Sequence, residues 1–285
     1  MDKNSKEYVV NNIKNLLEDL EDNNSKKCKN LSKWLNNYVA YLQYENNFDS
    51  KRLCRYRKGE VLKVNLGFNI GSEEGGVHYC MVLDKENSKN SPVVTVIPLT
   101  SVKPNKDLSK LKKGEIYLGD ELFRLLNLKI KTIYENLTKS IEKTQIKINQ
   151  VKDNKEVIIN KLEDIETQIK NLEEDDKIED KEKLLSILYD VFKETEKDYM
   201  DRNNKIKEIQ SEINSMNSEQ KFIEQISKEI SMMKKGSIAL VNQITTISKM
   251  RIIDPKNDKY VLSGIKFSSE KLNLIDEELR KMYLK

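Results

Sequence analysis

The sequence contains few of the residues that bend, lock or cross-link a chain: nine glycines, four prolines and three cysteines in 285 residues. The cysteines, Cys28, Cys54 and Cys80, form no C-x-x-C pair and no disulfide framework, so we expect a reducing cytoplasm. The first residues lack the apolar core of an export signal, and no apolar run reaches about 18 residues. The sequence therefore predicts neither export nor a membrane span.

Aromatic residues are also scarce, at 7% of the chain, whereas charged residues make up 34% and the mean hydropathy is -0.70. A chain this polar is poorly suited to a single compact globule, which indicates that much of it forms elongated helices. The 51 lysines and arginines against 47 aspartates and glutamates leave a net charge of only +4. This balance permits nucleic-acid binding without arguing for it, because both signs are mixed along the chain.

Residues 121–234 contain neither glycine nor proline, and apolar residues recur there at alternating 3-4 spacing. A charged break at residues 173–182 separates two segments of similar length, so we expect an inserted antiparallel coiled-coil hairpin with arms on the order of 70 Å long. Its balanced charges favour contact with a protein partner or a second copy over contact with RNA. The seam residues expected from this spacing include Ile141, Thr144, Val151, Lys155, Ile158, Leu162, Ile165, Ile169, Leu184, Leu188, Val191, Thr195, Ile206, Ile209 and Gln220.

The stretch from Gly59 to Ser101 has a different pattern, that of three β-strands. Residues 61–66 alternate between apolar and polar, and residues 79–83 and 93–99 are apolar runs typical of buried strands. The loop at residues 67–77 holds four of the nine glycines, so its backbone must make turns that a Cβ would oppose. It has no P-loop spacing and leads into a strand, which argues against a phosphate cradle.

Two separated segments carry a family resemblance. Residues 71–79 read GSEEGGVHY, and residues 98–100 read PLT. Much later, residues 236–247 read GSIALVNQITTI and are followed by Lys249 and Arg251. In this order, the segments resemble the MazF/PemK toxins, the ribonucleases of bacterial toxin–antitoxin pairs.

This resemblance implies an α+β fold, a small SH3-like β-barrel with a C-terminal helix. The barrel would be built from residues 58–120 and 235–285, interrupted by the coiled-coil hairpin at 121–234. A helical extension at residues 1–50 precedes it, with two amphipathic stripes separated by a break near Asn24. The chain thus has the parts of one family member with two helical additions.

The resemblance also implies an activity. Family members cleave single-stranded RNA at selected sequences without a metal or other cofactor, leaving 2′,3′-cyclic phosphate and 5′-hydroxyl ends. They act in the cytoplasm, are held in check by an antitoxin protein, and usually pair their barrels as homodimers. We therefore expect an endoribonuclease with an antitoxin partner.

The two positions that carry most of this chemistry in the family fall at His78 and Thr100. His78, the only histidine, replaces an arginine of the family. An imidazole, with an unperturbed pKa of about 6.5, can serve as base or acid near neutral pH, but it does not hold phosphate bidentately as arginine does. Thr100 would donate its hydroxyl to the phosphate. Ser72, Glu73 and Arg251 are further candidates for phosphate positioning or acid–base help, and Gln243 for hydrogen bonding to the substrate or within the protein.

Other interpretations stay open. His78 at the start of a strand can be a structural residue, and with Cys80 it supplies only two of the ligands that a metal site needs. The barrel would then be an inactive module that binds a protein or nucleic acid through its coiled-coil arm. Poisoning of gyrase, which a related barrel fold binds, is a third idea that the GSE loop disfavours. The position of His78, in a cleft beside Thr100 or packed inward, discriminates between the first two.

Two segments before the barrel are also ambiguous. Trp34, the only tryptophan, lies on the apolar stripe of the second helix, where packing against the barrel is favoured over stacking on a base. The basic segment at residues 51–58, with Tyr56 in its middle, suits either phosphate contact or a solvated linker.

The amphipathic stripes of the N-terminal extension predict that it contacts the barrel and regulates it. Deletion of the residues before Lys51 is therefore expected to change either the RNA-cleaving activity or the solubility of the purified protein. An unchanged result in both measurements would remove a regulatory role.

Overall fold

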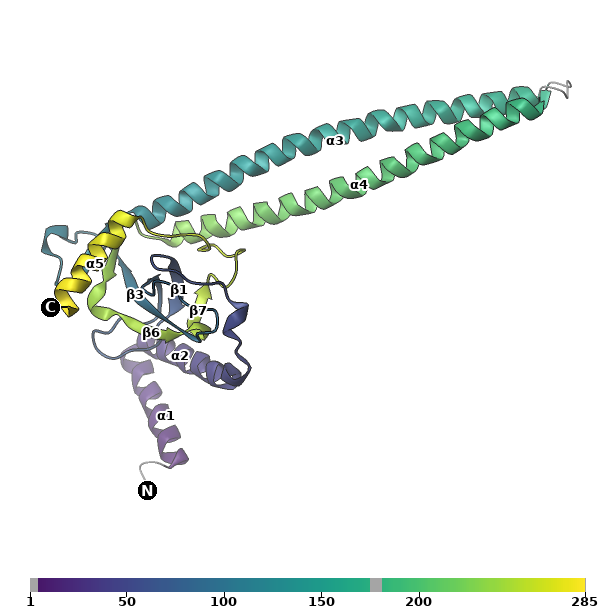
Figure 1. The fold of residues 1–285 in the computed structure, drawn as a ribbon. Coiled ribbons are helices and arrows are strands. Elements are labelled where there is room, and N and C mark those ends of the chain that lie inside the picture. Colours follow the sequence, from purple (N-terminus) through teal and green to yellow (C-terminus); the bar gives the residue numbers. More distant parts are fainter. Residues whose placement is uncertain (1–4, 175–180, 285) are drawn as a thin grey trace. The chain divides into compact units, whose positions relative to one another are not determined.

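The computed structural model describes residues 5–174 and 181–284. They form two compact units (Figure 1): residues 5–128 with 228–284, and residues 129–174 with 181–227. The first unit contains the sheet and three helices, and the second contains most of two long helices. Among the described residues, none of the helices has the length and apolarity needed to span a membrane.

The sheet of the first unit has seven antiparallel strands, in the order β4-β5-β3-β2-β1-β7 with β6 also paired to β3. The nine-residue β3 organises it, because its first half pairs with β6 and its second half with β5, while β2 runs along the other side. Strands that precede the insertion and strands that follow it therefore form one sheet. The strands are β1 (Val61–Asn65), β2 (Val77–Val82), β3 (Val93–Ser101), β4 (Glu115–Gly119), β5 (Ser237–Leu240), β6 (Thr245–Ser248) and β7 (Ile252–Asp254).

Alternating residues of these strands form the core on one face of the sheet. Val64, Cys80, Val82, Val94 and Ile247 are buried in one cluster. The period-two pattern of the sequence places these side chains together, since residues two apart on a strand face the same way. The expected α+β fold, a small barrel with a helical insertion, is confirmed.

The basic segment before β1 is not a free linker. Leu53 and Tyr56 belong to the core cluster, and the Tyr56 hydroxyl donates a hydrogen bond to Pro255 O over 2.8 Å. The buried Lys249 donates from Nζ to Ser88 O over 2.8 Å, with the Tyr56 ring 5.6 Å away. Tyr56 is thus unavailable for RNA, and the flanking cations are fixed by a buried anchor.

Three shorter helices belong to the first unit: α1 (Lys6–Asn23), α2 (Ser25–Tyr44) and α5 (Ser269–Tyr283). Asn24 ends α1 and caps α2, because its side-chain oxygen accepts from Lys27 N over 3.1 Å. Ser268 caps α5, because its hydroxyl oxygen accepts from Lys271 N. Both α1 and α2 keep apolar side chains exposed, among them Val10 and Val39.

The long helices are α3 (Glu121–Glu174) and α4 (Lys181–Met232), and their barrel-proximal ends are fixed by hydrogen bonds. Glu121 accepts from the backbone N–H of Ser268 over 2.6 Å and from its hydroxyl over 3.0 Å. Glu229 accepts from Lys63 Nζ over 2.6 Å and from the Tyr79 hydroxyl. The first turn of α3 is therefore tied to α5, and the last turns of α4 to β1 and β2.

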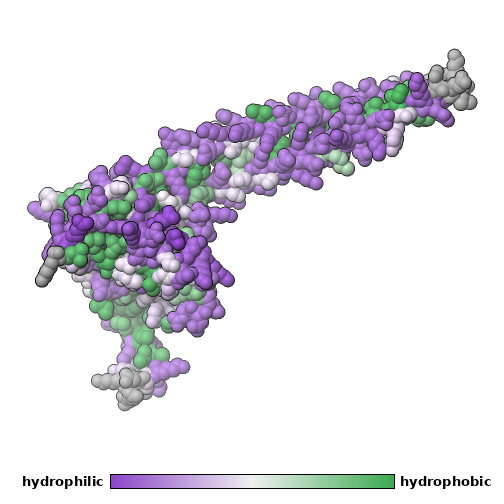
Figure 2. Space-filling model, viewed as in Figure 1, coloured by the Kyte–Doolittle hydropathy of each residue, from purple (hydrophilic) through white to green (hydrophobic). Residues whose placement is uncertain are grey.

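Within the second unit, α3 and α4 run antiparallel. Along α3, Lys147 pairs with Glu212, and Lys161 pairs with Asp198 over 2.9 Å, so partners fall along α4 as positions rise along α3. Figure 1 shows the two helices side by side, and Figure 2 shows mainly hydrophilic residues on their surface. The charged break at residues 173–182, expected as the tip, lies largely outside the described residues.

The contact line between these helices is narrower than the 3-4 spacing predicts. The buried residues fall mostly at intervals of seven or fourteen residues, with Ile226 further along α4: they are Thr144, Val151, Ile158 and Ile165 on α3, and Leu188, Thr195, Ile209 and Ile226 on α4. Other residues expected in the seam are exposed to solvent instead: Ile141, Leu162 and Ile169 are 52%, 44% and 42% exposed. Their expected place in the seam is wrong, because a two-helix pair covers only a narrow stripe of each helix.

Two adjacent isoleucines test this contact line. Ile158 is 6% exposed and Ile159 is 39% exposed. Ile158→Ala should lower the free energy of unfolding of the helical pair by about 2 kcal/mol, because it leaves a cavity between the helices, and Ile159→Ala by well under half of that. Urea denaturation followed by circular dichroism measures both. Equal losses would contradict the buried line.

Candidate functional site

The glycine-rich loop between β1 and β2 is closed at its base by backbone hydrogen bonds. Leu66 N donates to Gly76 O over 2.7 Å, and Gly76 N donates to Gly67 O over 2.6 Å. Gly67 has φ +96, and a Cβ there would lie 2.8 Å from Arg251 Nη2 and 3.0 Å from the Trp34 ring. Only glycine allows the guanidinium and the indole to approach the loop this closely.

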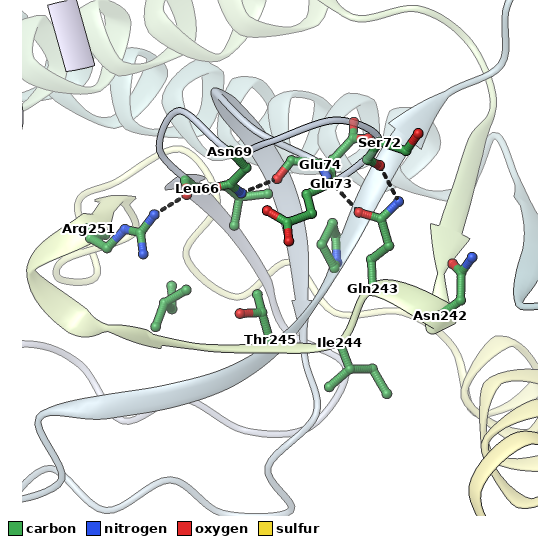
Figure 3. A pocket seen from close by; sticks show the side chains of 12 residues that line it. Leu66, Asn69, Ser72, Glu73, Glu74, Asn242, Gln243, Ile244, Thr245 and Arg251 are labelled. Carbon is green, nitrogen blue, oxygen red and sulfur yellow. Dashed lines mark hydrogen bonds between the residues drawn. The ribbon is translucent and has the colours of Figure 1, made fainter. Parts of the chain in front are cut away.

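Gln243 holds the far end of the loop. Its Oε1 accepts from Glu74 N over 2.6 Å, and its Nε2 donates to Ser72 O over 3.3 Å (Figure 3). Asn69 Nδ2 adds a bond within the loop, to Glu74 O over 2.7 Å. Both polar atoms of the Gln243 side chain are used in this way, so its structural role is the one that the contacts support.

A cavity of about 610 Å³, here called the loop cavity, lies between this loop and the segment that leads into β6. Its volume is in the range of small-ligand sites. Four of the six predicted site residues line it, namely Ser72, Glu73, Gln243 and Arg251. The other lining residues are Leu66, Asn69, Glu74, Pro98, Asn242, Ile244, Thr245 and Ile247 (Figure 3).

His78 and Thr100 lie beside the loop cavity and do not line it. The pairing of Tyr79 with Leu99 and of Cys80 with Pro98, continued by one residue, sets His78 opposite Thr100. Opposed residues share a face of the sheet, so both side chains lie on the face of Pro98, which does line the cavity. The predicted pair is therefore adjacent, and both side chains are partly buried.

The His78 ring is oriented by two acceptors. Nδ1 lies 3.2 Å from Glu74 Oε1 and 3.3 Å from Leu99 O, and the side chain is 25% exposed. Because both neighbours accept, Nδ1 carries a hydrogen, which leaves Nε2 as the atom able to take a proton. The Glu74 carboxylate thus helps to fix the orientation of the imidazole ring.

Arg251 is partly committed to the fold. Its Nε donates to Asn65 O over 2.8 Å and its Nη2 donates to Leu66 O, while the Trp34 ring lies 5.3 Å from the guanidinium carbon. Burial lowers the pKa of the guanidinium, yet its ordinary value is so high that the group stays charged. Two of its five N–H groups are occupied, and the others can bind an anion.

Sequence reasoning missed Glu74 as a partner of His78. A spacing of four residues predicts contact on a helix, whereas here the chain turns back through Gly75 and Gly76, the latter with φ +84. The paired glycines were the only signal of this turn. Across the described residues, no three His, Cys, Asp or Glu side chains gather as a metal site would require.

A comparison with known families finds a match in the first part of the chain. Residues 57–168 match the family model described as PemK-like, MazF-like toxin of type II toxin-antitoxin system. This part of the chain belongs to the MazF/PemK toxin family. The match covers β1 to β4 and continues into α3, beyond the point where the resemblance was expected to end. Strands β5 to β7 lie outside the MazF/PemK match and join it through their pairing with β3 and β1. A search among curated proteins found no significant match.

The role of Gln243 generates a prediction. Gln243→Ala should accelerate hydrogen exchange at the Glu74 amide by about tenfold, because that amide loses its acceptor. Asn242→Ala is the matched control, since Asn242 lines the same cavity and no hydrogen bond joins it to the loop among the described residues. NMR measures the exchange rate of the Glu74 amide in both variants. An unchanged rate in Gln243→Ala would contradict the anchoring role of Gln243.

Proposed function

We propose that this MazF/PemK-family protein is an endoribonuclease toxin that cleaves single-stranded RNA at selected sequences. The observation that carries the proposal is the Glu74–His78 pair beside Thr100, at the edge of the loop cavity. Family membership supports a toxin, and this pair supplies a group suited to proton abstraction. An antitoxin partner, a cytoplasmic location and a homodimer formed through the barrel are part of the same proposal.

In the proposed reaction, Nε2 of His78 takes the proton of a ribose 2′-hydroxyl. The 2′-oxygen attacks the adjacent phosphorus, and the bond from phosphorus to the 5′-oxygen breaks, leaving a cyclic phosphate and a 5′-hydroxyl. Glu74 stabilises the imidazolium that forms, and a group such as Glu73, when protonated, or a water supplies the proton to the 5′-oxygen.

The phosphate needs donors that strengthen as negative charge grows on it. The Thr100 hydroxyl and the unoccupied N–H groups of Arg251 are assigned to this task, and Ser72 to positioning. Two carboxylates, Glu73 and Glu74, would repel a phosphate bound between them. The negative charge of Glu74 is offset by His78 once the imidazole is protonated. Glu73 Oε2 accepts from Ile70 N over 3.3 Å, which holds this carboxylate within the loop. The phosphate is therefore expected on the Arg251 side of the cavity.

A second candidate function is that of a binding module that presents the helical pair to a protein. The observation that favours it is a row of exposed apolar residues on α4, consisting of Leu185, Tyr189, Phe192 and Tyr199. They recur at helical spacing next to the buried line, which is typical of a surface that another helix covers.

The test of the nuclease is cleavage of a long single-stranded RNA by purified protein in EDTA. His78→Ala is expected to lower the cleavage rate by at least about a hundredfold, and Thr100→Ala by about tenfold or more. Glu74→Gln should also lower it, because the imidazolium loses its carboxylate. Thr95→Ala is the matched control: it lies on the same strand, on the opposite face from Thr100, and should cleave as the unaltered protein does.

The outcomes separate the candidates. Cyclic-phosphate ends that disappear in His78→Ala and Thr100→Ala support the reaction above. Cleavage that survives in His78→Ala keeps the nuclease and removes His78 as base. An absence of cleavage over a broad set of RNAs shifts the assignment to the binding module.

A further inference from the structure

A second cavity is also lined by residues of the glycine-rich loop. This helix cavity, of about 390 Å³, is enclosed by α2 and by the base of the loop, and it shares only Asn69 with the loop cavity. Its volume is in the range of small-ligand sites. Because α2 precedes residue 57, this wall lies outside the part of the chain that matches the family.

Two aromatic side chains, Trp34 and Phe68, line the helix cavity. Trp34 is held in place by the Arg251 guanidinium at 5.3 Å and by the rings of Tyr38 and Tyr41, whose centroids lie 5.8 and 6.2 Å away. It is nevertheless only partly buried. A fixed aromatic surface that reaches a cavity is a platform on which a planar group can stack.

Polar groups of α2 surround this platform. Asn30, Lys33 and Asn37 lie on the Trp34 face of the helix and line the same cavity. Among the described residues, no hydrogen-bond partner occupies the side-chain amides of Asn30 and Asn37. Of the residues that line the helix cavity, none is acidic, in contrast to the loop cavity with its two glutamates.

We propose that the helix cavity binds a nucleobase of single-stranded RNA. Aromatic side chains that stack on unpaired bases, amides that hydrogen-bond to base edges, and a cation for the backbone phosphate are the groups by which proteins recognise single strands. Here Trp34 and Phe68 supply the stacking surface, Asn30 and Asn37 the base-edge contacts, and Lys33 the cation.

The inference rests on the proposed function, since it assigns a subsite to the same RNA. Both cavities are lined by the same loop and share Asn69, so neighbouring nucleotides of one strand can occupy both. The N-terminal extension would then set which sequence is cut. Trp34 would both pack against the barrel and stack on a base, two roles that the sequence analysis treated as alternatives.

The chain offers a direct probe, because Trp34 is its only tryptophan. Stacking of a base on the indole is expected to quench its fluorescence. The full chain would be titrated with short homopolymeric RNAs of each base, with an abasic ribose-phosphate oligomer of equal length, and with 5′-mononucleotides. We expect saturable quenching by at least one base-containing RNA and none by the abasic oligomer.

A matched pair of variants locates the effect. Asn37→Ala should lower the affinity for the RNA that quenches Trp34 fluorescence by roughly tenfold. It should also relax the base preference of cleavage at one position near the cut. Asn36→Ala removes the same side chain one residue away, at an exposed position outside the cavity, and should leave both readouts unchanged. Neither variant touches Arg251 or His78.

Each result bears on one proposal. Equal quenching by the abasic oligomer, equal effects of both variants, or mononucleotides that bind as tightly as RNA would overturn the base subsite. Cleavage of RNA without any quenching would overturn it too and leave the nuclease standing. Base-dependent quenching that Asn37→Ala weakens, in a protein that cleaves no RNA, would support the subsite and remove the nuclease.

Discussion

The contact on which the barrel site depends is the enclosure of the Arg251 guanidinium. It lies between the Trp34 ring and the carbonyl oxygens of Asn65 and Leu66, and Gly67 leaves the space for it. Three distant parts of the chain meet here: α2, the end of β1 with the loop that follows it, and the segment after β6. A charged group so placed needs these acceptors, because an unpaired buried charge would be strongly destabilising. The same contact therefore fixes the loop, the N-terminal helices and the wall of both cavities.

The sheet explains how a long insertion leaves this site intact. Strand β5, which follows the insertion in the sequence, pairs with both β3 and β4, which precede it, so the two segments that the insertion separates are joined by backbone hydrogen bonds. Glu121 and Glu229 tie down the two ends of the inserted helices at separate places in the first unit. The residues that begin and end the insertion are thus bonded to the same unit that carries the site.

Local patterns in the sequence predicted the elements, and the contacts between distant elements escaped prediction for physical reasons. Alternation located the strands and the glycines located the loop, because both depend on residues close in sequence. The Glu74–His78 contact depends on the left-handed backbone conformation of Gly76. The stacking of Trp34 on Arg251 depends on the tertiary packing of α2 against the barrel. The 3-4 spacing in α3 predicted which face is apolar but not how much of it a single partner helix covers, hence the exposed Leu162.

The resemblance to the family places an arginine at the position of His78, and the neighbouring Glu74 suits a histidine there. An arginine beside the Glu74 carboxylate would form an ion pair, and its charge would then be shared between that carboxylate and a bound phosphate. A histidine in the same place is oriented by the carboxylate, which leaves Nε2 of the ring to take a proton in the proposed reaction. In the proposed reaction the phosphate is then left to Thr100 and Arg251. Arg251 can serve in this way because two backbone carbonyls orient it without neutralising its charge.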